Sequence, residues 1–195
     1  MIAMAKKQEF QKDKPSISWV SHFVLTQKQQ KALLKWVFYG AILVFLSVMQ
    51  DVLLSKVRLF GATTELIPCA IFLICVLEGT HTGSVFALVA SLLYLFSGTA
   101  PGPYSMVAIT FFSIGVCIFR QAYLQESFSS AYLCVTIAMV LYVLTNFAFG
   151  VFLGLTPFSR IIGFLITAVL SLLAVPILYP VFKAIGAFGG QSWKE

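Results

Sequence analysis

Six apolar runs, separated by short segments with polar residues or glycines, constrain this chain more than any other feature of its sequence. They cover residues 37–54, 66–77, 84–96, 106–119, 131–153 and 161–182. A helix needs about 20 apolar residues to cross the hydrocarbon core of a bilayer, and the last two runs reach that length. Because 59% of the 195 residues are hydrophobic and only 10% are charged, a water-soluble domain could not cover this apolar surface with polar groups. We therefore predict an all-α, polytopic integral membrane protein with about six transmembrane helices.

The run at residues 84–96 is short, and turn-forming residues flank it on both sides. Gly79 and Gly83 precede it, and Gly98, Pro101 and Gly102 follow it. As a helix the run would rise about 20 Å, less than the roughly 30 Å of a hydrocarbon core. It is predicted to be half of a broken or re-entrant span, or a central helix packed inside the others. An ordinary hairpin of two membrane helices, and five spans with one re-entrant element, are the alternatives.

The distribution of basic residues predicts the orientation. Most of them precede the first run or follow the last, and with six spans Arg120 falls on that same side. The opposite side holds Lys56, Arg58 and Arg160. Since loops rich in lysine and arginine stay in the cytoplasm, both termini are predicted to be cytoplasmic. We divide the chain into a lysine-rich cytoplasmic or interfacial leader (1–25), one transmembrane helical domain (26–190) and a cytoplasmic tail (191–195).

Acidic and amide side chains lie at the ends of the predicted helices. Gln50 and Asp51 close the first run, Glu65 opens the second, and Glu78 ends it. Glu65 suits the positive end of the helix dipole, whereas Glu78 lies at the negative end and needs a partner or water. For Asp51, solvation at the membrane interface is favoured over an ion site. Asn146, inside the fifth run, is predicted to pair helices through a hydrogen bond.

No pattern in the sequence indicates catalysis. It lacks a nucleophile with a base, paired acids in mid-span, a phosphate-binding loop or a metal-binding histidine motif. The cysteines lie inside apolar runs at spacings that match no metal site, and we read them as packing residues. They are Cys69, Cys75, Cys117 and Cys134. We predict a protein that is not an enzyme and that uses no cofactor or metal.

A series of short motifs from about residue 37 to 120 resembles the rod-shape-determining MreD family. In order, the motifs are Gln50-Asp51, Arg58-Leu59-Phe60-Gly61, Glu65-Leu66, Leu77-Glu78-Gly79, Gly83, Ser97-Gly98 and Pro101-Gly102. Two positions depart from the family pattern. Thr64 stands where a proline is common, with Glu65 in place of aspartate, and Tyr94 stands where an aspartate is common before Leu-x-Ser-Gly.

The resemblance implies a non-catalytic scaffold of the cell-elongation machinery in the bacterial cytoplasmic membrane. Such proteins bind MreC, a single-span partner, and through it help to couple MreB filaments to peptidoglycan synthases. The resemblance also implies a fold similar to the substrate-binding subunits of energy-coupling-factor transporters. The expected partner-binding residues are Gln50, Asp51, Phe60, Gly61, Glu65, Glu78, Gly79, Gly83, Gly98, Pro101 and Gly102.

The alternative interpretation is a substrate-binding subunit of an energy-coupling-factor vitamin transporter. It would hold a small molecule in a pocket of Trp, Tyr, Asn and acidic side chains near the outer face. Those subunits favour alanine-rich spacings in the first span for docking to the coupling subunit, and residues 37–54 contain only Ala41. The basic leader is interpreted as a determinant of topology and of attraction to anionic lipid, and no nucleic-acid partner is expected.

Overall fold

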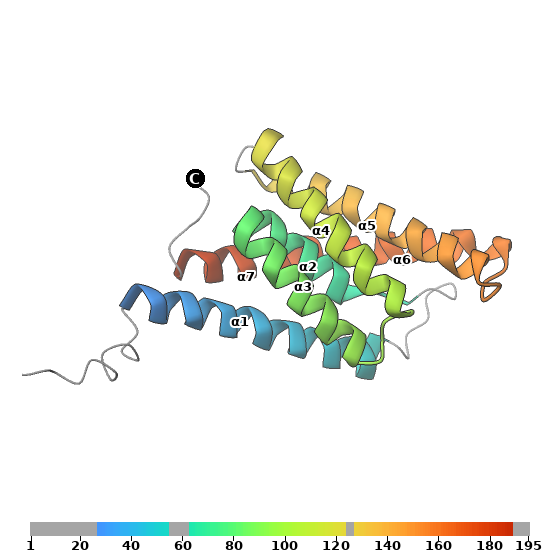
Figure 1. The fold of residues 1–195 in the computed structure, drawn as a ribbon, viewed down its shortest axis with the longest axis horizontal. Coiled ribbons are helices and arrows are strands. Elements are labelled where there is room, and N and C mark those ends of the chain that lie inside the picture. The colour runs from blue at the N-terminus through green and yellow to red at the C-terminus, as the bar shows by residue number, and fades with distance from the viewer. Residues whose placement is uncertain (1–26, 55–62, 124–126, 189–195) are drawn as a thin grey trace, which may run out of the picture.

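The computed structural model describes residues 27–54, 63–123 and 127–188, and every element within them is a helix (Figure 1). The leader, the tail, Phe60 and Gly61 lie outside the described residues. The helices are α1 (Gln27–Met49), η2 (Gln50–Leu54), α2 (Leu66–Glu78), α3 (Thr80–Phe96), α4 (Pro103–Tyr123), α5 (Phe128–Phe152), η3 (Phe158–Arg160), α6 (Ile161–Leu172) and α7 (Val175–Phe188). Here η2 is a π-helical turn that continues α1, and η3 is a turn of 3₁₀ helix.

Three of these helices are long and apolar enough to cross a bilayer: α1 with the start of η2, α4 and α5. The segment from η3 through α6 and the helix α7 together make a fourth candidate span, bent by 44°. The apolar helices α2 and α3 are shorter. The prediction of an all-α, polytopic membrane protein is thus confirmed.

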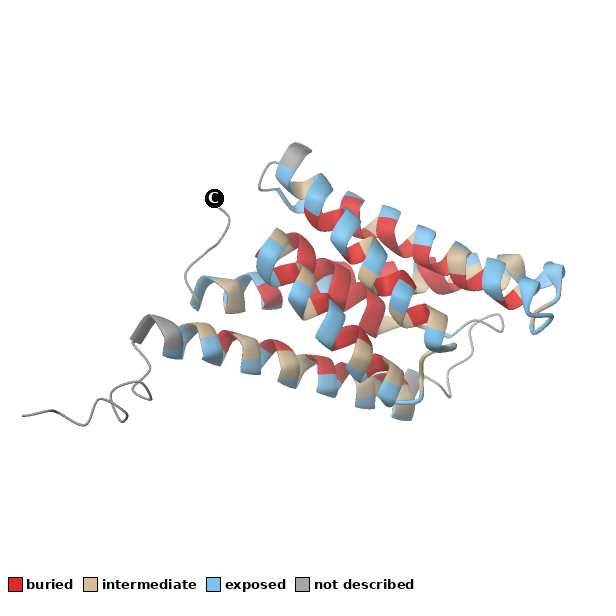
Figure 2. Ribbon diagram, viewed as in Figure 1, coloured by how far each residue is buried: buried red, intermediate tan, exposed pale blue. Residues whose placement is uncertain are grey.

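Helix α2 lies at the centre of the bundle. Its residues from Ile67 to Val76, and Glu78, are buried, and α1, α3, α4, α5 and α7 all pack against it. Figure 2 shows the buried residues concentrated in this middle layer. The helix is 13 residues long, shorter than a membrane span. The central short helix is therefore α2, whereas α3 exposes an apolar face that includes Val85, Leu93 and Phe96.

The turn predicted across residues 78–83 is confined to one residue. Glu78 ends α2, Gly79 reverses the chain, and Thr80 already begins α3. Gly83 therefore lies within a helix, and the expectation that it forms a turn before residues 84–96 is wrong. The reversal brings α3 directly back along α2.

The last apolar run contains Pro176 and Pro180, and the structure breaks the helix just before the first of them. The chain leaves the helix at Leu173 and Ala174, and Pro176 falls in the first turn of α7. A proline there loses no helical hydrogen bond, because the first amides of a helix have no internal acceptor. Pro180 lies inside α7 without ending it. After the bend, α7 ends on the same side of the bundle as the start of α1 (Figure 1).

Candidate functional site

A buried ion pair holds the Glu78 end of α2. Lys35 Nζ of α1 lies 2.5 Å from Glu78 Oε2, and Tyr39 Oη donates a hydrogen bond of 2.6 Å to Glu78 Oε1. Tyr39 Oη also lies 3.4 Å from the carbonyl oxygen of Phe182 in α7. We call Lys35, Tyr39 and Glu78 the Glu78 cluster. It joins α1, α2 and α7, and it supplies the partner that a carboxylate at a helix C-terminus requires.

Aromatic rings surround the Glu78 cluster. The Tyr39 ring packs edge-on against Phe182, with centroids 5.8 Å apart, and Trp36 lies 5.2 Å from Phe86 of α3. Lys35, Tyr39 and Glu78 are all buried behind these rings. A charge pair in such a dry environment is costly to break, because the remaining charge has no water to solvate it.

The two glycines beside Glu78 allow three helices to approach closely. Gly79 has a φ of 89°, and a Cβ atom at this position would overlap the guanidinium group of Arg120 on α4. A Cβ on Gly83 would lie 3.2 Å from the Cα of Cys75 and 3.2 Å from the Sγ of Cys117. The thiol of Cys75 donates to the carbonyl oxygen of Gly83, 3.3 Å away. Gly79 and Gly83, which were expected to bind a partner, thus make close contacts between α2, α3 and α4 of the same chain.

At the other end of α2, two side chains from distant segments satisfy its first amides. Gln50 Oε1 of η2 accepts hydrogen bonds from Leu66 N at 2.8 Å and Ile67 N at 3.3 Å. Glu65 N donates to Ser171 Oγ of α6 at 2.8 Å. The first amides of a helix have no internal partner, so these bonds act as a cap. Gln50 and Glu65, predicted separately at two helix ends, lie together.

Substitution of Gln50 by leucine is expected to destabilise the bundle by about 1–3 kcal/mol, because two buried amides lose their acceptor. Thermal unfolding of the purified protein in detergent measures the effect. Gln121→Leu is the matched control, since the Gln121 side chain accepts its bond from Thr80 in an exposed position. Equal melting temperatures for the two variants would contradict the capping role.

Three further polar side chains from α3 and α5 gather near Glu65. Tyr94, Tyr142 and Asn146 are 2%, 0% and 3% exposed. The Tyr142 ring packs edge-on against Phe72 of α2, with centroids 6.1 Å apart. Asn146 was predicted to pair helices, and Tyr94 was noted as standing where the MreD pattern commonly has an aspartate, whereas Tyr142 carried no signal beyond a hydroxyl within an apolar run. Asp51 is half-buried beside this group.

The remaining candidate residues lie in the turn between α3 and α4. Gly98 and Pro101 are exposed, and Gly98 has a φ of 75°. Gly102 lies under the ring of Tyr104, which stacks on Phe149 of α5 with centroids 5.2 Å apart. Of the residues expected to bind a partner, Gly98 and Pro101 reach the surface, whereas Gln50, Glu78 and Gly83 are buried within the bundle.

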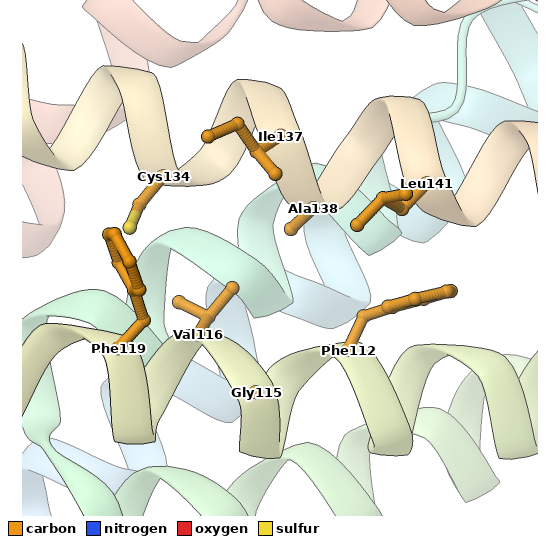
Figure 3. Close-up of a pocket in the computed structure, with 8 residues that line it drawn as sticks. All are labelled: Phe112, Gly115, Val116, Phe119, Cys134, Ile137, Ala138 and Leu141. Atoms are coloured by element: carbon orange, nitrogen blue, oxygen red, sulfur yellow. The ribbon is translucent and has the colours of Figure 1, made fainter.

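A groove of about 210 Å³ runs between α4 and α5, and Figure 3 shows side chains of the two helices facing each other across it. Its lining is apolar and consists of Phe112, Gly115, Val116, Phe119, Cys134, Ile137, Ala138 and Leu141. Such a lining fits an acyl chain or an apolar side chain. It differs from the pocket of Trp, Tyr, Asn and acidic side chains that the transporter interpretation requires.

The chain matches no family model, no curated protein and no solved structure. Its function is therefore argued from its own residues.

Proposed function

We propose that this protein is a non-catalytic membrane scaffold similar to MreD, which binds an MreC-like single-span partner in the cell-elongation machinery. The proposal is supported by the positions of the MreD-like motifs in the fold. Gln50 and Glu65 cap one end of α2, and Glu78, Gly79 and Gly83 join helices at the other. Residues that resemble the family pattern thus hold a central helix rigidly between its neighbours, which suits a protein that positions other proteins.

The proposal includes the orientation of the bundle in the bacterial cytoplasmic membrane, with both termini in the cytoplasm. Its support is that basic residues gather at the Glu78 end. Lys35 pairs with Glu78, Arg120 packs against Gly79, and Lys183 lies one residue after Phe182, which contacts Tyr39. This end of the bundle is then cytoplasmic, as basic residues favour. The Glu65 end and the α3–α4 turn face the opposite side.

The proposed partner-binding surface is the exposed end of α3 with the turn that follows it. Phe96 is 81% exposed and continues an exposed apolar stripe with Val85, Val89 and Leu93. Gly98 and Pro101 extend this surface beyond the helix. A single membrane span with an apolar face can pack along the stripe, because small and aromatic residues at helix ends favour close contact. The buried residues of the MreD-like motifs, among them Gln50, Glu78 and Gly83, hold together the helices behind this surface.

Co-purification in gentle detergent with an MreC-like partner tests the proposal, and depletion of the protein is expected to round the cells. Phe96→Ala should weaken recovery of the partner about tenfold, as expected for an exposed aromatic anchor of an interface. Phe152→Ala is the control, since Phe152 is 86% exposed and is the last residue of α5. Helix α5 ends on the same side of the bundle as α3 does (Figure 1). Recovery of the protein alone from cells that express the partner would overturn the proposal. A stoichiometric vitamin found by mass spectrometry would favour the transporter interpretation.

A further inference from the structure

Oxygen-bearing side chains from four segments meet where α2 begins. We call them the Glu65 cluster: Gln50 of η2, Glu65, Tyr94 of α3, and Tyr142 and Asn146 of α5. Gln50 is fixed beside Glu65 because it caps the next two amides. Glu65 is fixed by the bond from its own amide to Ser171. Gln50 and Glu65 are therefore held in fixed positions, and the cluster is not a set of mobile surface side chains.

Four oxygen atoms of this cluster are buried without a hydrogen bond of regular geometry. Glu65 Oε2, Tyr94 Oη, Tyr142 Oη and Asn146 Oδ1 are inaccessible to solvent and make no hydrogen bond of regular geometry with any described residue. Each buried polar atom left in this state costs about 1–3 kcal/mol. Several such atoms at one place usually mark an ordered water or an ion.

The same groups face one another. Tyr142 lies at hydrogen-bonding range of Glu65, Tyr94 and Asn146, and Tyr94 at that of Gln50, although none of these pairs has regular hydrogen-bond geometry. Asp51 also lies within electrostatic range of Tyr94. The neighbours are thus acids, phenols and amides, and no lysine or arginine of the described chain is among them. Lys35, which could have neutralised an acid, pairs with Glu78 at the far end of α2.

We propose that the Glu65 cluster binds a small monovalent metal cation, for which Na⁺ is the best match. Carboxylate, amide and hydroxyl oxygens are the donors that hard cations prefer. Glu65 is the one carboxylate among the five members of the cluster, and its charge balances one positive charge, with Asp51 nearby. No group of three or more His, Cys, Asp or Glu side chains suited to a metal occurs in the described part of the chain, so the donor set differs from that of zinc or iron.

This site goes beyond the proposed scaffold function. A cation there links the start of α2 to α3 and α5 at the end of the bundle where the α3–α4 turn lies. It gives the four oxygens a partner and offsets the charge of Glu65 in a dry environment. The binding of Na⁺ therefore stabilises the folded bundle, and the gain follows the Na⁺ concentration to saturation.

Thermal unfolding of the full-length protein in detergent tests the proposal, with NaCl compared with N-methylglucamine chloride at equal ionic strength. The melting temperature is expected to rise with Na⁺ concentration to a plateau and to stay constant in the bulky organic cation. Broadening of the ²³Na resonance by the protein is expected over the same concentration range. Glu65→Gln is expected to abolish both effects, and Tyr142→Phe to shift the midpoint to higher Na⁺ concentration.

Tyr179→Phe is the matched control, because it removes the same hydroxyl from α7, where the ring lies under Lys183. It should leave the Na⁺ dependence unchanged. Equal melting curves in the two salts, or a Na⁺ effect that persists in Glu65→Gln, would overturn the site and leave the cluster as a place for buried water. Neither result bears on partner binding, which Phe96→Ala tests separately.

Discussion

Replacement of Lys35 by methionine is expected to lower the free energy of unfolding by about 3–5 kcal/mol, because it removes a buried cation in direct contact with the Glu78 carboxylate. Lys35 Nζ and Glu78 Oε2 are 2.5 Å apart, and both side chains are buried behind Trp36 and Phe182. Methionine keeps the length and the apolar stem of lysine, so packing changes little. Unfolding of the purified protein in detergent with increasing denaturant measures the loss.

Two variants separate the ion pair from general effects of removing a lysine. Lys31→Met removes a charge one turn earlier on α1, where the side chain is exposed, and should change stability by less than about 1 kcal/mol. The double variant Lys35→Met with Glu78→Gln should recover much of the lost stability, because no buried charge remains. If the double variant is as unstable as the two single losses added together, the pair is not coupled in the way that the structure indicates.

The sequence alone predicted that Glu78 needed a partner, because an acid at the C-terminus of a helix opposes the helix dipole. It did not identify Lys35, which lies 43 residues earlier. Lys35 stands among the lysines that precede the first apolar run, from which the sequence predicts only the cytoplasmic side. The pairing depends on how α1 packs against α2, and that packing is a tertiary property that no local spacing records.

Hydropathy predicted the helical class and the approximate positions of the helices, but it did not predict which short helix is central. The runs at residues 66–77 and 84–96 have similar lengths and compositions. The two helices differ in what surrounds them. Other helices cover α2 on all sides, whereas α3 keeps an exposed apolar stripe. In a membrane, an apolar face toward lipid and one toward protein look alike in sequence, because both environments accept the same side chains.

Tyr94 and Tyr142 show a second limit of the sequence. A tyrosine in an apolar run is typical of the membrane interface, where its hydroxyl reaches water. Here both rings are buried, and the two hydroxyls meet near Glu65 because α3 and α5 pass the start of α2. Where the MreD pattern that the sequence resembles commonly has an aspartate, Tyr94 still brings an oxygen to this place. Only the three-dimensional arrangement shows that these groups form one cluster.

Substitution of Gly79 by alanine is expected to destabilise the protein by about 1–3 kcal/mol, chiefly through backbone strain, because the atoms that its Cβ would meet belong to the flexible end of the Arg120 side chain. Gly79 has a φ of 89° and a ψ of −176°, a region that is almost exclusive to glycine. Its added Cβ would also overlap the guanidinium group of Arg120. Because Gly79 alone joins α2 to α3, neither helix can shift without disturbing the Glu78 cluster. Thermal unfolding and recovery of folded protein in detergent measure the effect.

Other glycines of the chain separate the two causes. Gly98 also has a positive φ, but a Cβ there meets no atom within 4 Å, so Gly98→Ala reports strain without a clash. Gly163 is helical and equally open, and Gly163→Ala should be neutral or stabilising by about 0.5–1 kcal/mol. The expected order of destabilisation is Gly79→Ala, then Gly98→Ala, then Gly163→Ala. In an Arg120→Ala background the clash disappears, and Gly79→Ala should then cost no more than Gly98→Ala. An unchanged cost in that background would show that the close approach of α4 to the α2–α3 turn contributes nothing to stability.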